Sequence, residues 1–361
     1  MRSRETELLG ATQLRALAAM REVSEVAQVL VDAADSPFVR HFSAGYDEAA
    51  LEAGIAAELK ELRQLIDTYA PEERLRDLLL VPLDLYNIKV ALRLWARRVS
   101  DSGAGAATGV ADTPDAHGLT AVADLYGLPG TRSVEQIHEA VLSEGGGGGA
   151  IASAGDLDSA SRAVAGAIGR SLQAYAASGR SGQALELAID RLARLYRIEA
   201  AAAGAGDADA DPDGVREALQ AEADIAAAEL VVRGSAGGLA WEVARWGLLD
   251  MPSMAELEDL YIGGAQEWVG RLAPFSGELR LVLGEIADGH DASAALRAAQ
   301  RRIGVTMASW LLRPPSFAFA YGYARKKLDD LANLRLACLA RLRGVAADQV
   351  EQRIRFGMAA A

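Results

Sequence analysis

Cysteine and histidine are scarce in this sequence of 361 residues. The single cysteine, Cys338, excludes an internal disulfide and is typical of a chain that stays in a reducing cytosol. The four histidines, at positions 41, 117, 138 and 290, form no His-Glu-x-x-His motif and no cluster with the spacing of a zinc site. The sequence therefore predicts no metal site.

Motifs that bind phosphate or activate a nucleophile are also absent. No Gly-x-x-x-x-Gly-Lys-Ser/Thr loop occurs, and the glycine run at 145–149 has neither the lysine nor a preceding strand. No Gly-x-Ser-x-Gly elbow occurs either. Cys338 lies in an apolar segment with no histidine near it in the sequence. We therefore predict no catalytic residues and no bound cofactor.

Long apolar runs are missing as well. No uninterrupted apolar window of roughly 18 residues occurs, which is the length that a membrane-spanning helix needs. Arg2, Arg4 and Glu5 interrupt the segment in which a signal peptide would be apolar. We expect a cytoplasmic chain without a membrane span, which reaches a membrane only through a partner.

Positive charge is in deficit, because 37 Lys and Arg residues face 50 Asp and Glu residues and give a net charge of -13. Nucleic acids and anionic membrane surfaces attract clustered positive charge. The overall charge therefore predicts that nucleic acid is not a partner of this chain.

The sequence is rich in residues that favour helices. Ala, Leu, Glu and Arg dominate, and alternating runs of β-branched residues are nearly absent. Apolar residues recur with a helical period in three segments, 7–33, 48–70 and 183–203. Three Gly-, Ser- or Asp-rich segments without an apolar stripe predict loops at 101–118, 143–155 and 204–214. We predict an all-α fold.

Three ten-residue segments resemble one another: DLYNIKVALR (84–93), DIAAAELVVR (224–233) and DLANLRLACL (330–339). Each begins with Asp, and apolar or small residues follow at one, four and eight places, on one face of a helix. The first and third share an Asn and a basic residue two places after it, and the first and second end in Arg. The defining residues are Asp84, Asn87, Lys89, Arg93, Asp224, Arg233, Asp330, Asn333 and Arg335.

The recurrence of this pattern indicates a structural role. An aspartate on a mostly apolar helix must find hydrogen-bond donors, because an unpaired buried carboxylate is costly. An ion pair or a contact with a helix end would satisfy it in each copy, whereas a catalytic role would not recur three times. We predict three diverged helical-bundle repeats, at 1–150 (with the N-terminal helices), 151–283 and 284–361.

Two acidic segments partly match metal-binding motifs. Residues 209–214 have the spacing of the first half of an EF-hand loop, but Gln220 stands where calcium requires a bidentate Glu. Asp329, Asp330 and Asn333 resemble half of a terpene-synthase metal motif, for which we find no second half. We therefore interpret residues 209–214 as a polar loop that caps the next helix. We interpret Asp329, Asp330 and Asn333 as part of a repeat helix.

The segment YARKKLDDLANLRLACLARLRGVAADQVEQRI, residues 323–354, resembles the closing signature of the C subunit of the V/A-type rotary ATPases, a family that includes the d subunit of eukaryotic vacuolar enzymes. The matching positions are Tyr323, Lys326, Asp330, Asn333, Leu334, Arg335, Gly344 and Val345. Asp84 with Asn87, and the LPG at 128–130, resemble family landmarks in the first repeat. The second repeat departs from the pattern, with Ala227 in place of the Asn.

The resemblance implies a non-catalytic rotor subunit. In family members three helical bundles, arranged around a pseudo-threefold axis, form a funnel that receives the end of the central shaft. The opposite face rests on the membrane ring of proteolipid subunits, and torque passes through the rotor during ion transport. The implied partners are therefore the shaft subunits and the proteolipid ring, and the implied location is peripheral to the membrane.

Two other functions remain open from the sequence. A helical-repeat adaptor or scaffold unrelated to rotary motors would share the composition and the repeats, and would form an extended open solenoid. An α-helical metal-dependent enzyme would use Asp329 and Asp330 to bind magnesium.

Overall fold

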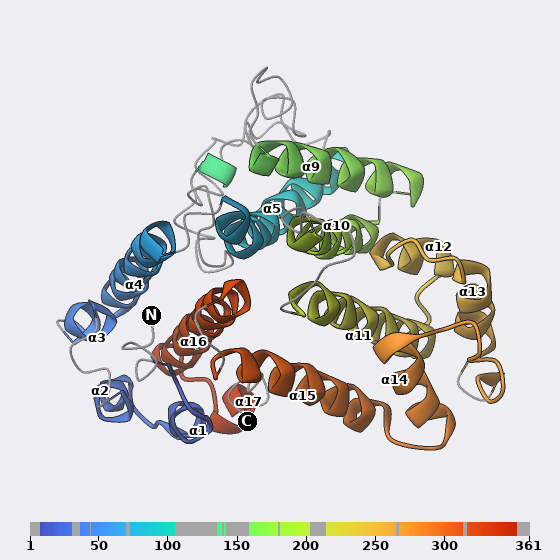
Figure 1. The fold of residues 1–361 in the computed structure, drawn as a ribbon. Coiled ribbons are helices and arrows are strands. Elements are labelled where there is room, and N and C mark those ends of the chain that lie inside the picture. The colour runs from blue at the N-terminus through green and yellow to red at the C-terminus, as the bar shows by residue number, and fades with distance from the viewer. Residues whose placement is uncertain are drawn as a thin grey trace. The chain divides into compact units, whose positions relative to one another are not determined.

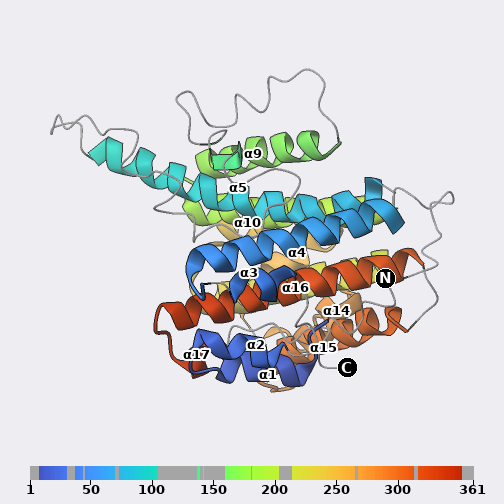
Figure 2. The same ribbon diagram turned by 90° about the vertical axis from the view of Figure 1, so that its left-hand side faces the viewer.

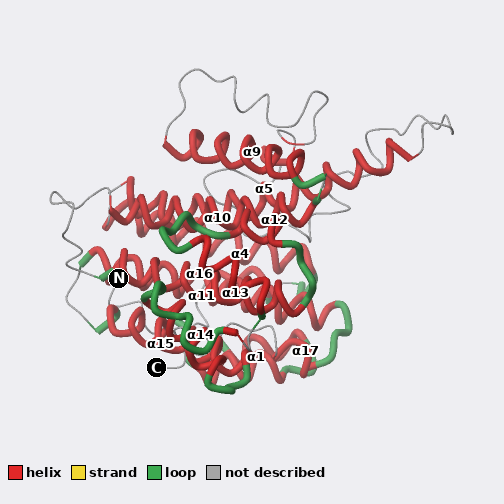
Figure 3. Tube along the Cα trace, turned by 90° about the vertical axis from the view of Figure 1, so that its right-hand side faces the viewer, coloured by secondary structure: helices red, strands yellow, loops and turns green. Residues whose placement is uncertain are grey.

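The computed structural model describes residues 8–30, 37–43, 45–69, 73–104, 136–138, 141, 159–179, 181–202, 214–264, 267–312 and 316–351. Within these ranges every regular element is a helix, and none is a strand (Figure 3). The all-α prediction is confirmed. The α-helices in chain order are α1 (Ala11–Ala19), α2 (Val26–Val29), α3 (Pro37–Phe42), α4 (Glu48–Tyr69), α5 (Glu73–Ala104), α9 (Ser159–Ala177), α10 (Gly182–Ala202), α11 (Val215–Ala236), α12 (Trp241–Ala244), α13 (Met254–Gly263), α14 (Gly277–Ala287), α15 (Ala292–Trp310), α16 (Phe317–Leu342) and α17 (Ala347–Glu351). The 3-10 turns are η2 (Val23–Glu25) and η6 (Arg245–Gly247).

Most of the predicted loop residues lie outside the described part of the chain. This holds for 143–155 and for nearly all of 101–118 and 204–214. The LPG at 128–130, which resembles a family landmark, also lies outside the described residues. Residues 101–104 belong to the last turn of α5, so that helix is four residues longer than the composition predicted.

The helix ends follow local chemistry. Helix α16 begins after Ser316, whose hydroxyl accepts a hydrogen bond from the Phe319 N–H at 3.2 Å. Helix α13 begins after Ser253, whose side chain makes no capping hydrogen bond. Pro82 lies inside α5 without ending it.

The chain forms two compact units, each of which combines separated parts of the sequence. Unit 1 contains Met1–Arg76, Pro212–Ala218 and Gln300–Ala361, and unit 2 contains Asp77–Asp211 and Leu219–Ala299. The division into three repeats, with boundaries after 150 and 283, and their arrangement around a pseudo-threefold axis stay predictions.

Unit 1 is built around α16, the long red helix of Figures 1 and 2. Seventeen of its 26 residues are buried, on more than one side, which is the pattern of a helix enclosed by others. It packs against α4 and α1, while α3 packs on α4 and α17 packs on α1. Both ends of the described chain therefore contribute to one core.

Unit 2 has its main core where α5, α9 and α10 meet. The Trp95 and Tyr175 rings meet edge to face there, with centroids 5.7 Å apart. Helix α12 and the turn η6 pack against α10, and α13 packs against α12. The buried residues of the core are Val81, Leu85, Ile88, Val90, Ala91, Leu92, Ala96, Ile137, Val141, Ile168, Tyr175, Leu185 and Ile189.

Helix α3 approaches α4 closely at a glycine. A Cβ on Gly54 of α4 would lie 3.0 Å from both the ring and the carbonyl oxygen of Phe38. On α9, a Cβ on Gly169 would meet nothing within 4 Å. The two helical glycines therefore differ only in whether another helix occupies the space of a side chain.

We expect Gly54→Ala to destabilise unit 1 by about 1–3 kcal/mol, because the backbone of α3 must move to admit the methyl group. Gly169→Ala should instead stabilise the chain by about 0.5–1 kcal/mol, because alanine loses less conformational entropy in a helix. Denaturant unfolding followed by circular dichroism measures both changes. A stabilising Gly54→Ala would contradict the close packing.

Candidate functional site

The third copy of the repeated segment, on α16, contains a buried ion pair that holds a backbone segment. Lys326 and Asp330 are 5% and 2% exposed and lie one helical turn apart. The Lys326 ammonium donates to the Asp330 carboxylate and, at 2.6 Å, to the Leu9 carbonyl oxygen. The Leu9 N–H donates to the other Asp330 oxygen at 2.9 Å. Both partners therefore hold the backbone of a single residue just before α1.

Burial dominates the ionisation of Asp330. It raises the pKa of this carboxyl from 3.8 to about 6, against the opposing effects of the Lys326 charge and of the hydrogen bonds from Lys326 and Leu9. At neutral pH this carboxyl is thus mostly ionised, although it is almost fully buried.

The second copy, on α11, also places its aspartate at the start of another helix. Asp224 accepts hydrogen bonds from the backbone of Leu279 and Glu278, in the first turn of α14, and from the Gln220 side chain at 3.1 Å. Burial raises the pKa of Asp224. The approach requires a glycine, because Gly277 has φ of 59° and a Cβ there would collide with the Asp224 carboxylate. Asp224 acts as a capping acceptor for α14.

The first copy, on α5, buries Asp84 and Asn87 completely. Its two basic residues reach α10: the Lys89 ammonium lies 2.7 Å from the Asp190 carboxylate, and the Arg93 guanidinium donates two hydrogen bonds of 2.6 Å to Glu186. The hydrogen bond to Glu186 raises the pKa of Arg93. These contacts join α5 to α10.

Three cation–carboxylate contacts join α16 to α4. The buried pair is Lys327 with Glu58, at 3.0 Å, and Glu58 also accepts a hydrogen bond from the Phe38 N–H of α3 at 3.2 Å. Arg335 and Arg343 continue the series toward the end of α16. Their distances are 2.7 Å for Arg335–Glu52 and 3.0 Å for Arg343–Glu48. The opposite order of numbers on the two helices shows that they are antiparallel.

The remaining repeat positions differ in their surroundings. Arg233 is exposed and pairs with Glu229 on its own helix, at 2.6 Å, so it does not match the role of Arg93. Tyr323 and Asn333 are buried on α16, each 2% exposed. The apolar stripe predicted one, four and eight places after each aspartate is buried, except that Val232 is half-buried.

The acidic pair considered for magnesium is committed to other partners. Asp329 pairs with Arg325 on the same helix at 3.3 Å, and Asp330 is enclosed by Lys326 and Leu9. Among the described residues, no three His, Cys, Asp or Glu side chains gather where they would hold a metal ion. The EF-hand-like residues 209–213 lie outside the described ranges. Burial raises the pKa of Cys338 to about 12, so its sulfur stays protonated.

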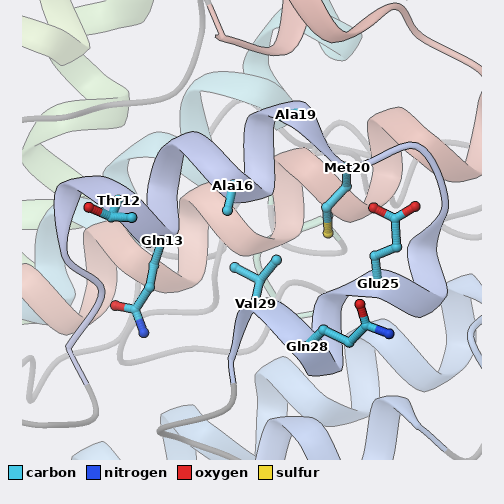
Figure 4. A pocket seen from close by; sticks show the side chains of 8 residues that line it. All are labelled: Thr12, Gln13, Ala16, Ala19, Met20, Glu25, Gln28 and Val29. Atoms are coloured by element: carbon cyan, nitrogen blue, oxygen red, sulfur yellow. The ribbon is translucent and has the colours of Figure 1, made fainter.

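An open groove lies between α1 and α2, with a volume of about 450 Å³ (Figure 4). Its only titratable side chain is Glu25, whose carboxylate accepts hydrogen bonds from the Arg21 and Glu22 N–H groups at 3.3 Å. The groove therefore offers no pair of groups for acid–base chemistry. The residues that line it are Thr12, Gln13, Ala16, Ala19, Met20, Glu25, Gln28 and Val29.

In the part of the chain that the structure describes, no helix combines the length and the apolarity needed to cross a membrane.

Comparison with known families places this helical chain among the subunits of rotary ATPases. A family model described as the ATP synthase (C/AC39) subunit matches residues 1–353, and the chain belongs to that family. The resemblance to the C subunit of the V/A-type enzymes, carried by Asp330, Asn333 and their neighbours, is confirmed. No curated protein matches the chain.

Asp330→Ala should destabilise the protein by about 3–5 kcal/mol, because it removes the acceptor of both the buried Lys326 side chain and the Leu9 N–H. The double variant Lys326→Met with Asp330→Leu should lose less, since it leaves no buried charge. Arg233→Ala, which breaks an exposed ion pair of the same spacing, should cost less than about 0.5 kcal/mol. Denaturant unfolding of the three variants tests the order, and equal losses for Asp330→Ala and Arg233→Ala would contradict it.

The pH dependence of stability should differ between the wild type and Asp330→Asn. The folded wild type holds the Asp330 proton more tightly than the unfolded chain does, because the pKa is about 6 instead of 3.8. Lowering the pH from 7 to 5 should therefore increase the unfolding free energy of the wild type by roughly 1 kcal/mol relative to the variant. Unfolding curves at pH 7, 6 and 5 measure this difference, and a constant or shrinking difference would contradict the assignment.

Proposed function

We propose that this chain is a non-catalytic rotor subunit of a V/A-type ATPase or ATP synthase, which couples the central shaft to the membrane proteolipid ring and transmits torque for ion transport. The observation that carries the proposal is the family match over residues 1–353, since it spans both compact units.

The internal contacts support a mechanical role. A part that passes torque must resist deformation, and closely packed helices are stiff because interiors have low compressibility. Helix α16 is fixed to α4 by Lys327, Arg335 and Arg343, and to the segment before α1 by the Lys326–Asp330 pair. These charged side chains, of the kind that a catalytic site would use, form ion pairs that join helices.

The proposed partners are the shaft subunits on one side and the proteolipid ring on the other, with the chain in the cytoplasm and peripheral to the membrane. Three helical repeats around a pseudo-threefold axis would form the funnel that receives the shaft. Exposed apolar side chains, such as Ile262 (70% exposed) and Leu312 (86% exposed), are of the kind that protein partners cover.

Purification of the tagged chain from detergent-solubilised membranes should recover the shaft and proteolipid subunits. Recovery of the chain without any other rotary ATPase component would contradict the proposal and favour an unrelated helical adaptor.

Membrane vesicles that lack the chain should separate ATP hydrolysis from ion transport. We expect hydrolysis by the peripheral sector to persist while ATP-driven ion uptake is lost, and the purified chain should restore uptake. Arg233→Ala, which changes only an exposed contact, should restore uptake as fully as the wild type. Uptake that does not depend on the chain would contradict a coupling role, and loss of hydrolysis itself would contradict a non-catalytic one.

A further inference from the structure

Helix α1 is held on α16 near both ends, and both contacts use backbone atoms, of Leu9 just before the helix and of Ala18 within it. At its start, the Leu9 peptide lies between Lys326 and Asp330. At its end, the Arg341 guanidinium donates a hydrogen bond of 2.9 Å to the Ala18 carbonyl oxygen. Three side chains of one helix therefore fix both ends of another.

The attachment of α4 to α16 is independent of these contacts. It uses different cations of α16, namely Lys327, Arg335 and Arg343, and their carboxylate partners all lie on α4. Loss of the α1 contacts therefore leaves the ion pairs between α4 and α16 in place.

The segment from Leu9 to Leu30, which we call the strap, contains an open groove. Its second helix, α2, is a single turn, and the groove of about 450 Å³ separates it from α1. Figure 4 shows the Met20 and Val29 side chains in the space between the two helices. The groove lowers the local packing density, and segments of lower contact density open at lower free energy than a fully packed core.

The polar contact itself favours reversible docking. An apolar residue in place of the buried pair would bind the strap without paying for desolvation, whereas burying a carboxylate and an ammonium is costly. The raised pKa of Asp330 reflects that cost, which is recovered when the strap leaves and water reaches the pair.

We propose that the strap is a separable element, docked on α16 by the Leu9 peptide and the Ala18 carbonyl, which detaches as one piece while α4 and α16 stay packed. Detachment exposes Leu14 and Leu17, which are fully buried in the docked state, together with the Lys326–Asp330 face of α16. The device is a conformational latch within unit 1.

Hydrogen exchange of the full-length chain, followed by mass spectrometry, tests the latch. Leu9→Pro removes the N–H that Asp330 accepts, and Leu9→Ile keeps both the N–H and the apolar bulk. We expect Leu9→Pro to accelerate exchange in strap peptides roughly tenfold or more, with α4 and α16 peptides unchanged and Leu9→Ile like the wild type. Equal acceleration in strap, α4 and α16, or identical behaviour of the two variants, would overturn the proposal.

Two measurements keep the test valid if Leu9→Pro does not fold. In the wild type at low denaturant concentration, strap amides should exchange through an opening of lower free energy than α4 amides, and equal free energies would overturn the proposal. Arg343→Ala weakens only the α4 contact with Glu48, so strap exchange should not change. Faster strap exchange in Arg343→Ala would show that the two attachments are not independent.

Discussion

The placement of an ammonium and a carboxylate where water is excluded constrains how unit 1 is built. Neither Lys326 nor Asp330 tolerates burial alone, and even as a pair they retain donors and acceptors that need partners. The backbone of one residue supplies one N–H and one C=O, and the backbone of Leu9 provides both partners. The segment just before α1 is thereby fixed on α16. This places α1 where it packs against both α16 and α17.

Two of the three repeated aspartates, Asp224 and Asp330, have the same role with different supporting residues. Asp330 and Asp224 both accept from the backbone near the start of a helix, and each also contacts the side chain four places before it, Lys326 or Gln220. The contact of Asp224 persists although Ala227 replaces the asparagine of the pattern, so that contact does not depend on the asparagine. The residue four places before the aspartate can thus change from a charged lysine to a neutral glutamine while the contact between the two side chains is retained.

The helices and their buried stripes could be predicted from the sequence, because a helical period of apolar residues is a local property. The partners of Asp330 could not, because Leu9 is 321 residues away and contributes backbone atoms, which any residue except proline would supply. The Lys327–Glu58 pair was also missed, since acidic residues are frequent and only the packing of α4 on α16 selects Glu58. The Lys326–Asp330 spacing of four residues was visible in the sequence, but its burial was not.

The contacts between Leu9 and α16 also govern the order in which the molecule can be completed. Helix α1 leaves the ribosome long before α16 does, so Leu14 and Leu17 emerge long before the surface that covers them. A chain with this connectivity must keep an apolar helix from aggregating throughout its synthesis, or rely on a chaperone to do so. Closure of unit 1 therefore waits until α16 has been synthesised, and its rate depends on contacts of very long sequence separation.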